Sequence, residues 1–206
     1  MSHRFNPRLL GLAAVLSLAA PAAVAQQATP LKAVEQSLAA TTSMTARFTQ
    51  ADGRGRTQSG TLSLQRPGKI RFEYGAGANM LMVGDGKNLT FIDYEVGQKS
   101  AWPIARSPLA VLLSPQPNLG RIARIEPQAN PGVVVVRARD ARRPEFGTLL
   151  LAFSKNSAAP GGLMLEGWTA IDAQNKRTTV KLDGQRYNVA IPAAAFTYRE
   201  PPKRGR

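Results

Sequence analysis

The sequence predicts a mainly β protein with a single large antiparallel sheet that is strongly curved or closed. Around Arg66-Pro67, apolar and polar residues alternate from Leu62 to Tyr74, which is the period-two pattern of strands with one buried face. Turn segments such as Gly84-Asp85-Gly86 separate about ten or eleven stretches of this kind. No long helical pattern lies between consecutive strand patterns, so we find no βαβ unit and expect antiparallel pairing.

Residues 1–25 have the pattern of a cleaved secretory signal peptide. Arg4 and Arg8 give a positive start, residues 9–20 form a short apolar run, and Ala23-Val24-Ala25 supplies small residues before the cleavage site. An uncleaved membrane anchor is the alternative, but the run is shorter than the ~20 apolar residues that span a bilayer. We expect a single domain over residues 26–200 and a disordered basic tail over 201–206.

A helix is expected before the first strand. Thr29 is a suitable N-cap residue, and Pro30 suits the first helical position. Leu31, Val34 and Leu38 share one helix face, and the helical pattern ends near residues 41–43. This apolar face must pack against another surface.

The strands that follow are short and are joined by turns rich in Gly, Pro, Asn and Asp. A last helical turn over 192–195 is expected before residues 196–198. The expected strands cover residues 44–49, 57–64, 69–74, 80–83, 89–94, 99–104, 121–126, 133–139, 148–154, 163–171 and 177–182.

A second helix interrupts the strand pattern after residue 106. Ser107 is placed to cap it and Pro108 to start it, and the prolines at 115 and 117 end it. Leu109, Leu112 and Leu113 form one stripe at helical spacing. A helix of two turns is not stable alone, so this stripe must lie against an apolar surface, as a lid or as ordinary core.

An open curved sheet needs helices across its concave face, and the chain offers these two. Met is common at permissive apolar surfaces, so a cavity for acyl chains is one interpretation of the concave face and an ordinary core is the other. Leu62 and Leu64 lie on the apolar side of their strand. The concave face is expected to hold Phe48, Ile70, Phe72, Tyr74, Met80, Met82, Phe91 and Trp102.

The residue types in the chain exclude most catalytic mechanisms. There is no Cys, and the one His, His3, is removed with the signal peptide. Ser-His-Asp and Cys-His catalysis, thiolate or imidazole metal sites and a cysteine-linked lipid anchor are therefore excluded. The 13 acidic residues are scattered without a paired spacing. We expect neither an enzyme nor a cofactor.

The net charge of +14 favours anionic partners such as membrane surfaces, acidic proteins or nucleic acid. The basic residues are spread along the chain, which is also what a generally basic protein would show. Only Arg142-Arg143 and residues 203–206 are grouped.

Five short motifs occur in an order that resembles one known family. They are Phe48-Thr49-Gln50, the segment from Gly60-Thr61-Leu62 through Arg66-Pro67-Gly68-Lys69, Asp85-Gly86-Lys87 with Leu89, Ser107-Pro108-Leu109, and Phe196-Thr197. In this order, behind a signal peptide and without Cys, they resemble the periplasmic outer-membrane lipoprotein carrier family, LolA. The resemblance runs from about Leu31 to Pro201.

The resemblance implies a fold and a function. The fold is an incomplete β-barrel whose helices form a lid over a hydrophobic cavity. The function is transport of acylated lipoproteins through the periplasm, from an inner-membrane ABC transporter to the outer membrane and an acceptor there, by a monomer that binds no nucleic acid. The arginine of the family's Arg-Pro pair holds the lid shut by hydrogen bonds to backbone carbonyls, and the matching residue is Arg66.

Three other functions remain open on the residues alone. The fold also occurs as the sensor domain of an envelope-stress regulator, which requires a second domain that we do not expect here. A carrier of phospholipids or glycolipids would have the same apolar face. A polyanion-binding protein would follow from the net charge alone.

Overall fold

The computed structural model describes residues 29–75 and 77–202. The predicted signal peptide and residues 203–206 of the predicted basic tail lie outside the described residues. None of the helices in the two described ranges has the length and apolar character needed to cross a membrane.

One antiparallel sheet of eleven strands dominates the described chain, as the turn and strand patterns predict. The spatial order is β6-β5-β4-β3-β2-β1-β11-β10-β9-β8-β7, so β6 and β7 are the two edges and the barrel is open. The strands are β1 Ser43–Asp52, β2 Thr57–Gln65, β3 Lys69–Tyr74, β4 Met80–Asp85, β5 Asn88–Asp93, β6 Gln98–Pro103, β7 Ala123–Glu126, β8 Val133–Ala138, β9 Thr148–Lys155, β10 Leu163–Ile171 and β11 Arg177–Tyr187.

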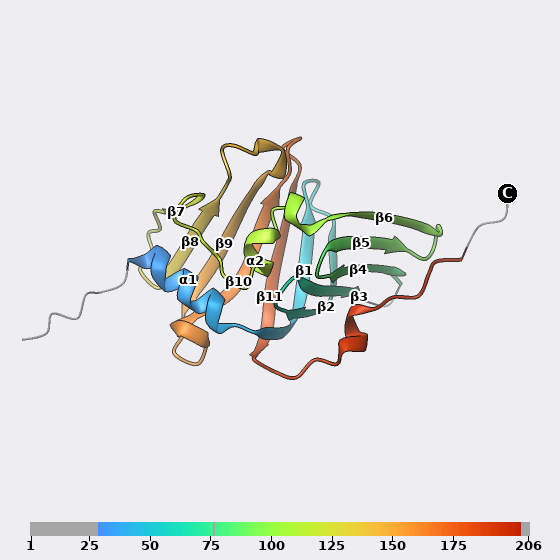
Figure 1. Cartoon of the computed structure of the whole chain (residues 1–206), viewed down its shortest axis with the longest axis horizontal. Coiled ribbons are helices and arrows are strands. Elements are labelled where there is room, and N and C mark those ends of the chain that lie inside the picture. The colour runs from blue at the N-terminus through green and yellow to red at the C-terminus, as the bar shows by residue number, and fades with distance from the viewer. Residues whose placement is uncertain (1–28, 76, 203–206) are drawn as a thin grey trace, which may run out of the picture.

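The sheet is strongly bent, and Figure 1 shows β3–β6 turned across the direction of β8–β11. The register shifts between Thr45 and Arg47, where β1 pairs with β11, and between Leu165 and Gly167, where β10 pairs with β9. Such bulges increase the local twist and bend of a sheet. The bend therefore lies near the middle strands, and both helices lie on the inner, concave side (Figure 1).

The strand β11 is longer than the predicted strand, which ends at residue 182. Asp183-Gly184 has the composition of a turn, but here Gly184 takes a φ of 64° within the strand. The strand continues beyond it, and Met44 pairs with Tyr187. The glycine therefore accommodates an irregularity instead of ending the strand.

The first helix, α1 Pro30–Ala40, begins as predicted. The Thr29 side chain accepts a hydrogen bond from the Lys32 N–H, 3.4 Å away, and Pro30 opens the helix. Val34 and Leu38 are buried in the main apolar cluster, and Leu31 packs against that cluster. The expected apolar face of α1 is therefore the face that covers the sheet.

The second helix is shorter than predicted. A 3-10 turn, η1 Ile104–Arg106, comes first, and α2 covers only Ala110–Leu113. The prediction that Ser107 caps α2 is wrong, because the helix begins at Ala110 with Leu109 at the N-cap position and without a side-chain cap. The Ser107 hydroxyl donates backward to the Ile104 carbonyl at 3.0 Å. The remaining 3-10 turns are η2 Pro144–Phe146, η3 Pro160–Gly162 and η4 Ala193–Phe196.

Two apolar clusters fill the two faces of the sheet. The large cluster lies between the concave face and the helices and includes residues of α1, α2 and nearly every strand. The small one lies on the outer face and consists of Leu81, Val83 and Ile92, against which Tyr94 and Tyr198 pack. The segment that follows β11 therefore crosses the outer face of β3–β5 and covers this small cluster.

Candidate functional site

Arg66 joins both helices to the turn between β2 and β3. Its Nε donates to the carbonyl of Leu112 in α2 at 2.9 Å, and its Nη1 donates to the carbonyl of Thr41, the C-cap of α1, at 2.6 Å. Carbonyl oxygens at the end of a helix carry partial negative charge, which a cation stabilises. One guanidinium thus holds two segments that are far apart in sequence.

The Arg66 guanidinium is largely buried, and none of the ion pairs in the described ranges includes it. Burial lowers its pKa to about 10, so it remains charged at neutral pH. Its positive charge is therefore satisfied by peptide carbonyls instead of a carboxylate. A contact of this kind is easier to exchange than a buried ion pair, because no second buried charge is left behind when it breaks.

Backbone contacts reinforce this junction. The Gly68 N–H donates to the Leu113 carbonyl at 3.1 Å, and the Arg66 N–H donates to the Thr42 carbonyl at 2.9 Å. Gly68 has a φ of 70°, and a Cβ placed on it would lie 2.7 Å from the Cα of Gly86 in the β4–β5 turn. Only glycine fits this close approach of two turns.

The helix α1 is also fixed to the other half of the sheet. The buried Ser37 hydroxyl donates to the Leu163 carbonyl at the start of β10, 3.0 Å away. A Cβ on Gly161 would lie 2.7 Å from the Ser37 Cα, so η3 passes directly against the helix. Glu35 accepts a hydrogen bond from the Leu119 N–H at 2.7 Å, which joins α1 to the segment after α2.

We expect Ser37→Ala to lower the free energy of unfolding by about 1–2 kcal/mol, because the Leu163 carbonyl then loses its buried donor. Urea unfolding of the variant and the wild type measures this difference. Ser157→Ala, at an exposed loop position, is the control and should leave stability unchanged. Equal stability of Ser37→Ala and wild type would mean that this hydrogen bond does not anchor α1.

The residues predicted for the concave face fall into two groups by exposure. The first group is buried in the main cluster, and its aromatic members meet edge to face: the Phe48 ring centroid lies 5.1 Å from that of Phe72 and 5.3 Å from that of Tyr74. These side chains form a packed interior under the helices. The group consists of Phe48, Leu62, Leu64, Ile70, Phe72, Tyr74, Leu112 and Leu113.

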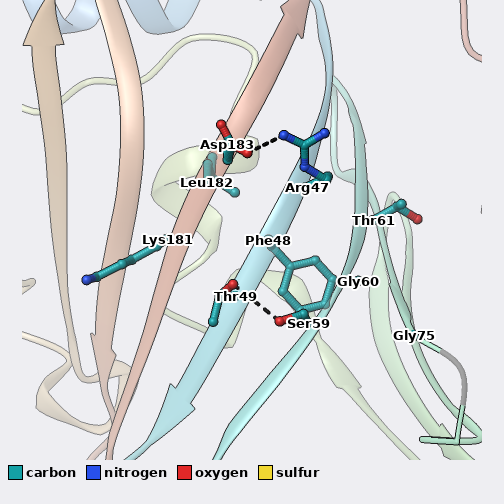
Figure 2. A pocket seen from close by; sticks show the side chains of 10 residues that line it. All are labelled: Arg47, Phe48, Thr49, Ser59, Gly60, Thr61, Gly75, Lys181, Leu182 and Asp183. Carbon is teal, nitrogen blue, oxygen red and sulfur yellow. Dashed lines mark hydrogen bonds and ion pairs between the residues drawn. The ribbon is translucent and has the colours of Figure 1, made fainter.

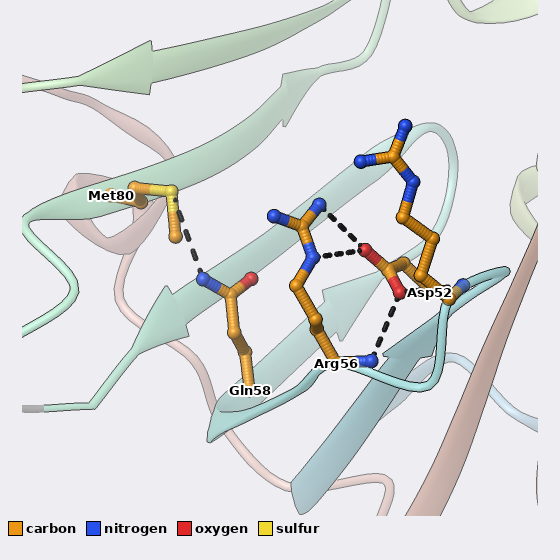
Figure 3. A network of polar contacts seen from close by, with 5 residues as sticks. Asp52, Arg56, Gln58 and Met80 are labelled. Atoms are coloured by element: carbon orange, nitrogen blue, oxygen red, sulfur yellow. Dashed lines mark hydrogen bonds and ion pairs between the residues drawn. The ribbon is translucent and has the colours of Figure 1, made fainter.

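The second group is half-buried. Phe91 of β5 pairs in register with Met82 of β4, so both side chains face the concave side. Trp102 of the edge strand β6 pairs with Leu89 of β5. Gln58 Nε2 donates to the sulfur of Met80 at 4.0 Å across the same face (Figure 3). The half-buried group therefore offers apolar surface that a ligand can reach without unfolding the sheet. It consists of Met80, Met82, Phe91, Trp102 and Leu109.

The space enclosed beneath the helices is small in this structure. A cavity of about 10 Å³ lies where α1, α2 and the sheet meet, and Arg66, Thr41 and Leu112 are among the residues that line it. Such a volume holds at most about one water molecule. A larger ligand can enter the concave side only if the helices move away from the sheet.

The half of the concave face that lies on β9–β11 was not predicted. Its strands showed the same alternation as β2 and β3, but no family motif pointed to their side chains. Phe72 meets one of them, Trp168, with a ring-centroid distance of 6.0 Å. The missed buried residues are Leu149, Leu151, Phe153, Leu163, Leu165, Trp168, Val180 and Leu182.

A separate hollow of about 530 Å³ is lined by polar side chains such as Arg47 and Thr49 and also by the apolar residues Phe48 and Leu182. Figure 2 shows Arg47 paired with Asp183, and Thr49 beside Ser59 with 3.3 Å between their hydroxyl oxygens. These side chains are exposed and bonded to one another. Within residues 29–75 and 77–202, no group of three or more Asp or Glu side chains is arranged to hold a metal ion.

Comparisons with known proteins agree on one family. The family model described as "Outer membrane lipoprotein carrier protein LolA" matches residues 39–199. The chain is 28% identical to an outer-membrane lipoprotein carrier protein of Chromobacterium violaceum over 205 residues, which cover 96% of this chain and 94% of that protein.

Two further similarities extend over most of the chain. An outer-membrane lipoprotein carrier protein of Bordetella avium is 30% identical over 203 residues, which cover 93% of this chain and 92% of that protein. The crystal structure of an uncharacterized conserved protein from Thermus thermophilus matches with a TM-score of 0.48 and 16% identity, over 82% of this chain and 92% of that one.

Proposed function

Because the chain belongs to the outer membrane lipoprotein carrier family LolA, we propose that it carries lipoproteins by holding their acyl chains against the concave face of the sheet, beneath α1 and α2. The family consists of carriers, so the protein is a transport protein and not an enzyme. The acyl chains would bind first at the half-buried residues such as Met82 and Phe91.

The observation that carries this proposal is the closed junction at Arg66. Two helices cover an apolar concave face, and a single guanidinium contacts a backbone carbonyl of each lid segment. An ordinary core needs no such exchangeable contact. A carrier needs one, because it must open for the cargo and favour the closed, empty state afterwards.

Loading is then a competition between two sets of contacts. Burial of acyl chains stabilises the loaded state by ~0.8 kcal/mol per CH₂ group. Opening breaks the Arg66 hydrogen bonds and the contact between Gly68 and Leu113, which favour the empty state. A balance between the two allows cargo to bind and later to leave, with energy supplied by the protein that delivers it.

We further propose that the protein works in the periplasm and that residues 1–25 are removed on export. The apolar run and the Ala23-Val24-Ala25 site support this location. The donor would be an inner-membrane ABC transporter, with delivery to the outer membrane and an acceptor there. An intact mass equal to that of residues 26–206 would support export. An intact mass equal to that of residues 1–206 in periplasmic extract would contradict it.

Native mass spectrometry of protein purified from periplasm tests the cargo. We expect a population heavier by the mass of a triacylated lipoprotein and released by mild organic solvent. A shift equal to a phospholipid or a glycolipid would keep the acyl-binding face but contradict lipoprotein as the cargo. A bare chain that takes up no lipoprotein from inner-membrane vesicles would contradict the carrier proposal.

We expect Leu112→Glu to weaken uptake of an acylated lipopeptide by at least about tenfold while the sheet stays folded, because a carboxylate beneath the helices opposes both lid closure and acyl burial. Uptake and urea unfolding should be measured on the same samples. Val111→Glu, at a half-buried position on the same helix, is the control with a smaller expected loss. Equal fractional losses of stability and uptake would make Leu112 a simple core residue.

A further inference from the structure

A set of exposed basic side chains lies at one end of the sheet, on and beside three strand connections and in the segment just before β7. This end is the upper one in Figure 1, whereas α1 crosses the lower part of the sheet. We refer to the set as the basic rim. It consists of Arg54 and Arg56 between β1 and β2, Lys176 between β10 and β11, Arg177 at the start of β11, Arg139, Arg142 and Arg143 between β8 and β9, and Arg121 before β7.

Strand pairing makes this rim continuous. Asp52 of β1 pairs with Thr178 of β11, so the β1–β2 turn lies beside the β10–β11 turn. The start of β9 pairs with the end of β10, which places the β8–β9 connection next in the row. The Arg139 N–H donates to the Ile122 carbonyl at 2.7 Å, which adds the residues before β7.

Four acidic residues share this end with the eight basic ones, which leaves it with a net charge of +4. Asp52, Asp140 and Asp172 each accept hydrogen bonds from backbone N–H groups of their own turns. Asp52 also pairs with Arg56, as Figure 3 shows. Among the ion pairs found in the described ranges, Arg56 is the one rim residue involved, and Glu145 is the fourth acid.

The middle of the rim also has an aromatic side chain. The Arg143 guanidinium carbon lies 5.4 Å from the ring centroid of Phe146, which is half-buried in the 3-10 turn Pro144–Phe146. Arginine beside an aromatic ring combines affinity for phosphate with an apolar group near the surface. Both properties suit the headgroup region of a bilayer.

We propose that the basic rim docks the protein on a bilayer that contains anionic phospholipids. The charges are spread over separate turns along a broad edge, which fits an extended layer of phosphate groups better than the acidic patch of a single protein. Guanidinium groups donate in pairs to phosphate oxygens. In this orientation, the end of the concave face that lies farther from α1 faces the membrane. It adds a membrane contact to the carrier function and does not depend on bound cargo.

The test measures partition of the cargo-free mature chain onto vesicles. One set contains phosphatidylglycerol with phosphatidylcholine, and the other contains phosphatidylcholine alone. We expect binding to the first set, reduced by added salt. Each basic residue near an anionic surface contributes about fivefold to partition, so Arg142→Ala with Arg143→Ala should reduce binding about 25-fold.

The matched control removes two positive charges at the opposite end of the sheet. Lys155→Ala with Arg186→Ala changes exposed residues of β9 and β11, and its binding should stay within about twofold of wild type. Unfolding midpoints of both variants should match wild type. Equal losses in the two variants would overturn the proposal in favour of general charge attraction.

Failure of wild type to bind the phosphatidylglycerol vesicles would also overturn the proposal and leave an acidic protein as the partner of the rim. Equal binding to both vesicle sets would overturn it as well. None of these results bears on the carrier proposal, which depends on the mass of the cargo. The two proposals can therefore fail separately.

Discussion

Arg66→Leu should fold like the wild type and accept an acylated lipopeptide, but deliver it to outer-membrane vesicles about 30-fold less well. The variant loses both hydrogen bonds to the lid, at Thr41 and Leu112, so the closed, empty state is less favoured. We take the net shift as about 2 kcal/mol, since the loss of two charge-assisted hydrogen bonds is partly offset by removal of a buried charge. Delivery is measured by the transfer of labelled lipopeptide.

The control for this prediction is Arg66→Lys. An ammonium group keeps the charge but cannot donate to two carbonyls in the planar geometry of a guanidinium. We therefore expect delivery between those of wild type and Arg66→Leu. Delivery by Arg66→Leu at the wild-type level would contradict the role of Arg66 in closing the lid.

Phe72→Ala should lower the free energy of unfolding by about 3–5 kcal/mol, which is the usual effect of removing a large side chain from a packed interior. Phe72 is 2% exposed and meets the rings of Phe48 and Trp168 edge to face. Guanidinium chloride unfolding measures the change. A loss below about 1 kcal/mol would mean that Phe72 borders an open cavity, not a packed core.

Phe91→Ala is the matched comparison on the same concave face. Phe91 is half-buried, so we expect a stability loss of less than about 1 kcal/mol. The variant should also take up less of an acylated lipopeptide, because Phe91 belongs to the half-buried group that a ligand can reach. If Phe72→Ala and Phe91→Ala had the same effect on stability, the division of the concave face into core and binding residues would be wrong.

The fold was predictable from local pattern, and its irregular parts were not. Period-two alternation located all eleven strands, and the pair Thr29-Pro30 located the start of α1. The end of β11 was misplaced, because Gly184 has the same local signature in a bulge as in a turn. Ser107 was misassigned as a cap, because α2 begins three residues after it, at Ala110.

The site was predictable only in part, because its contacts are non-local. The sequence places Arg66 in a turn, but its two acceptors belong to Thr41 and Leu112, which come from different helices. Those contacts follow from the family resemblance and not from spacing. The basic rim was dispersed in sequence, since strand pairing alone brings its turns together.

The pairing of β1 with β11 has a consequence for how the chain is made. These strands lie in the middle of the sheet but come from opposite ends of the domain. Until residues near Tyr187 have left the ribosome, the chain has two separate meanders and no central seam. Contacts between distant segments form slowly, so such a chain stays unfolded longer during synthesis. Closure of the sheet is therefore a late event, and each meander has an unpaired central strand until it happens.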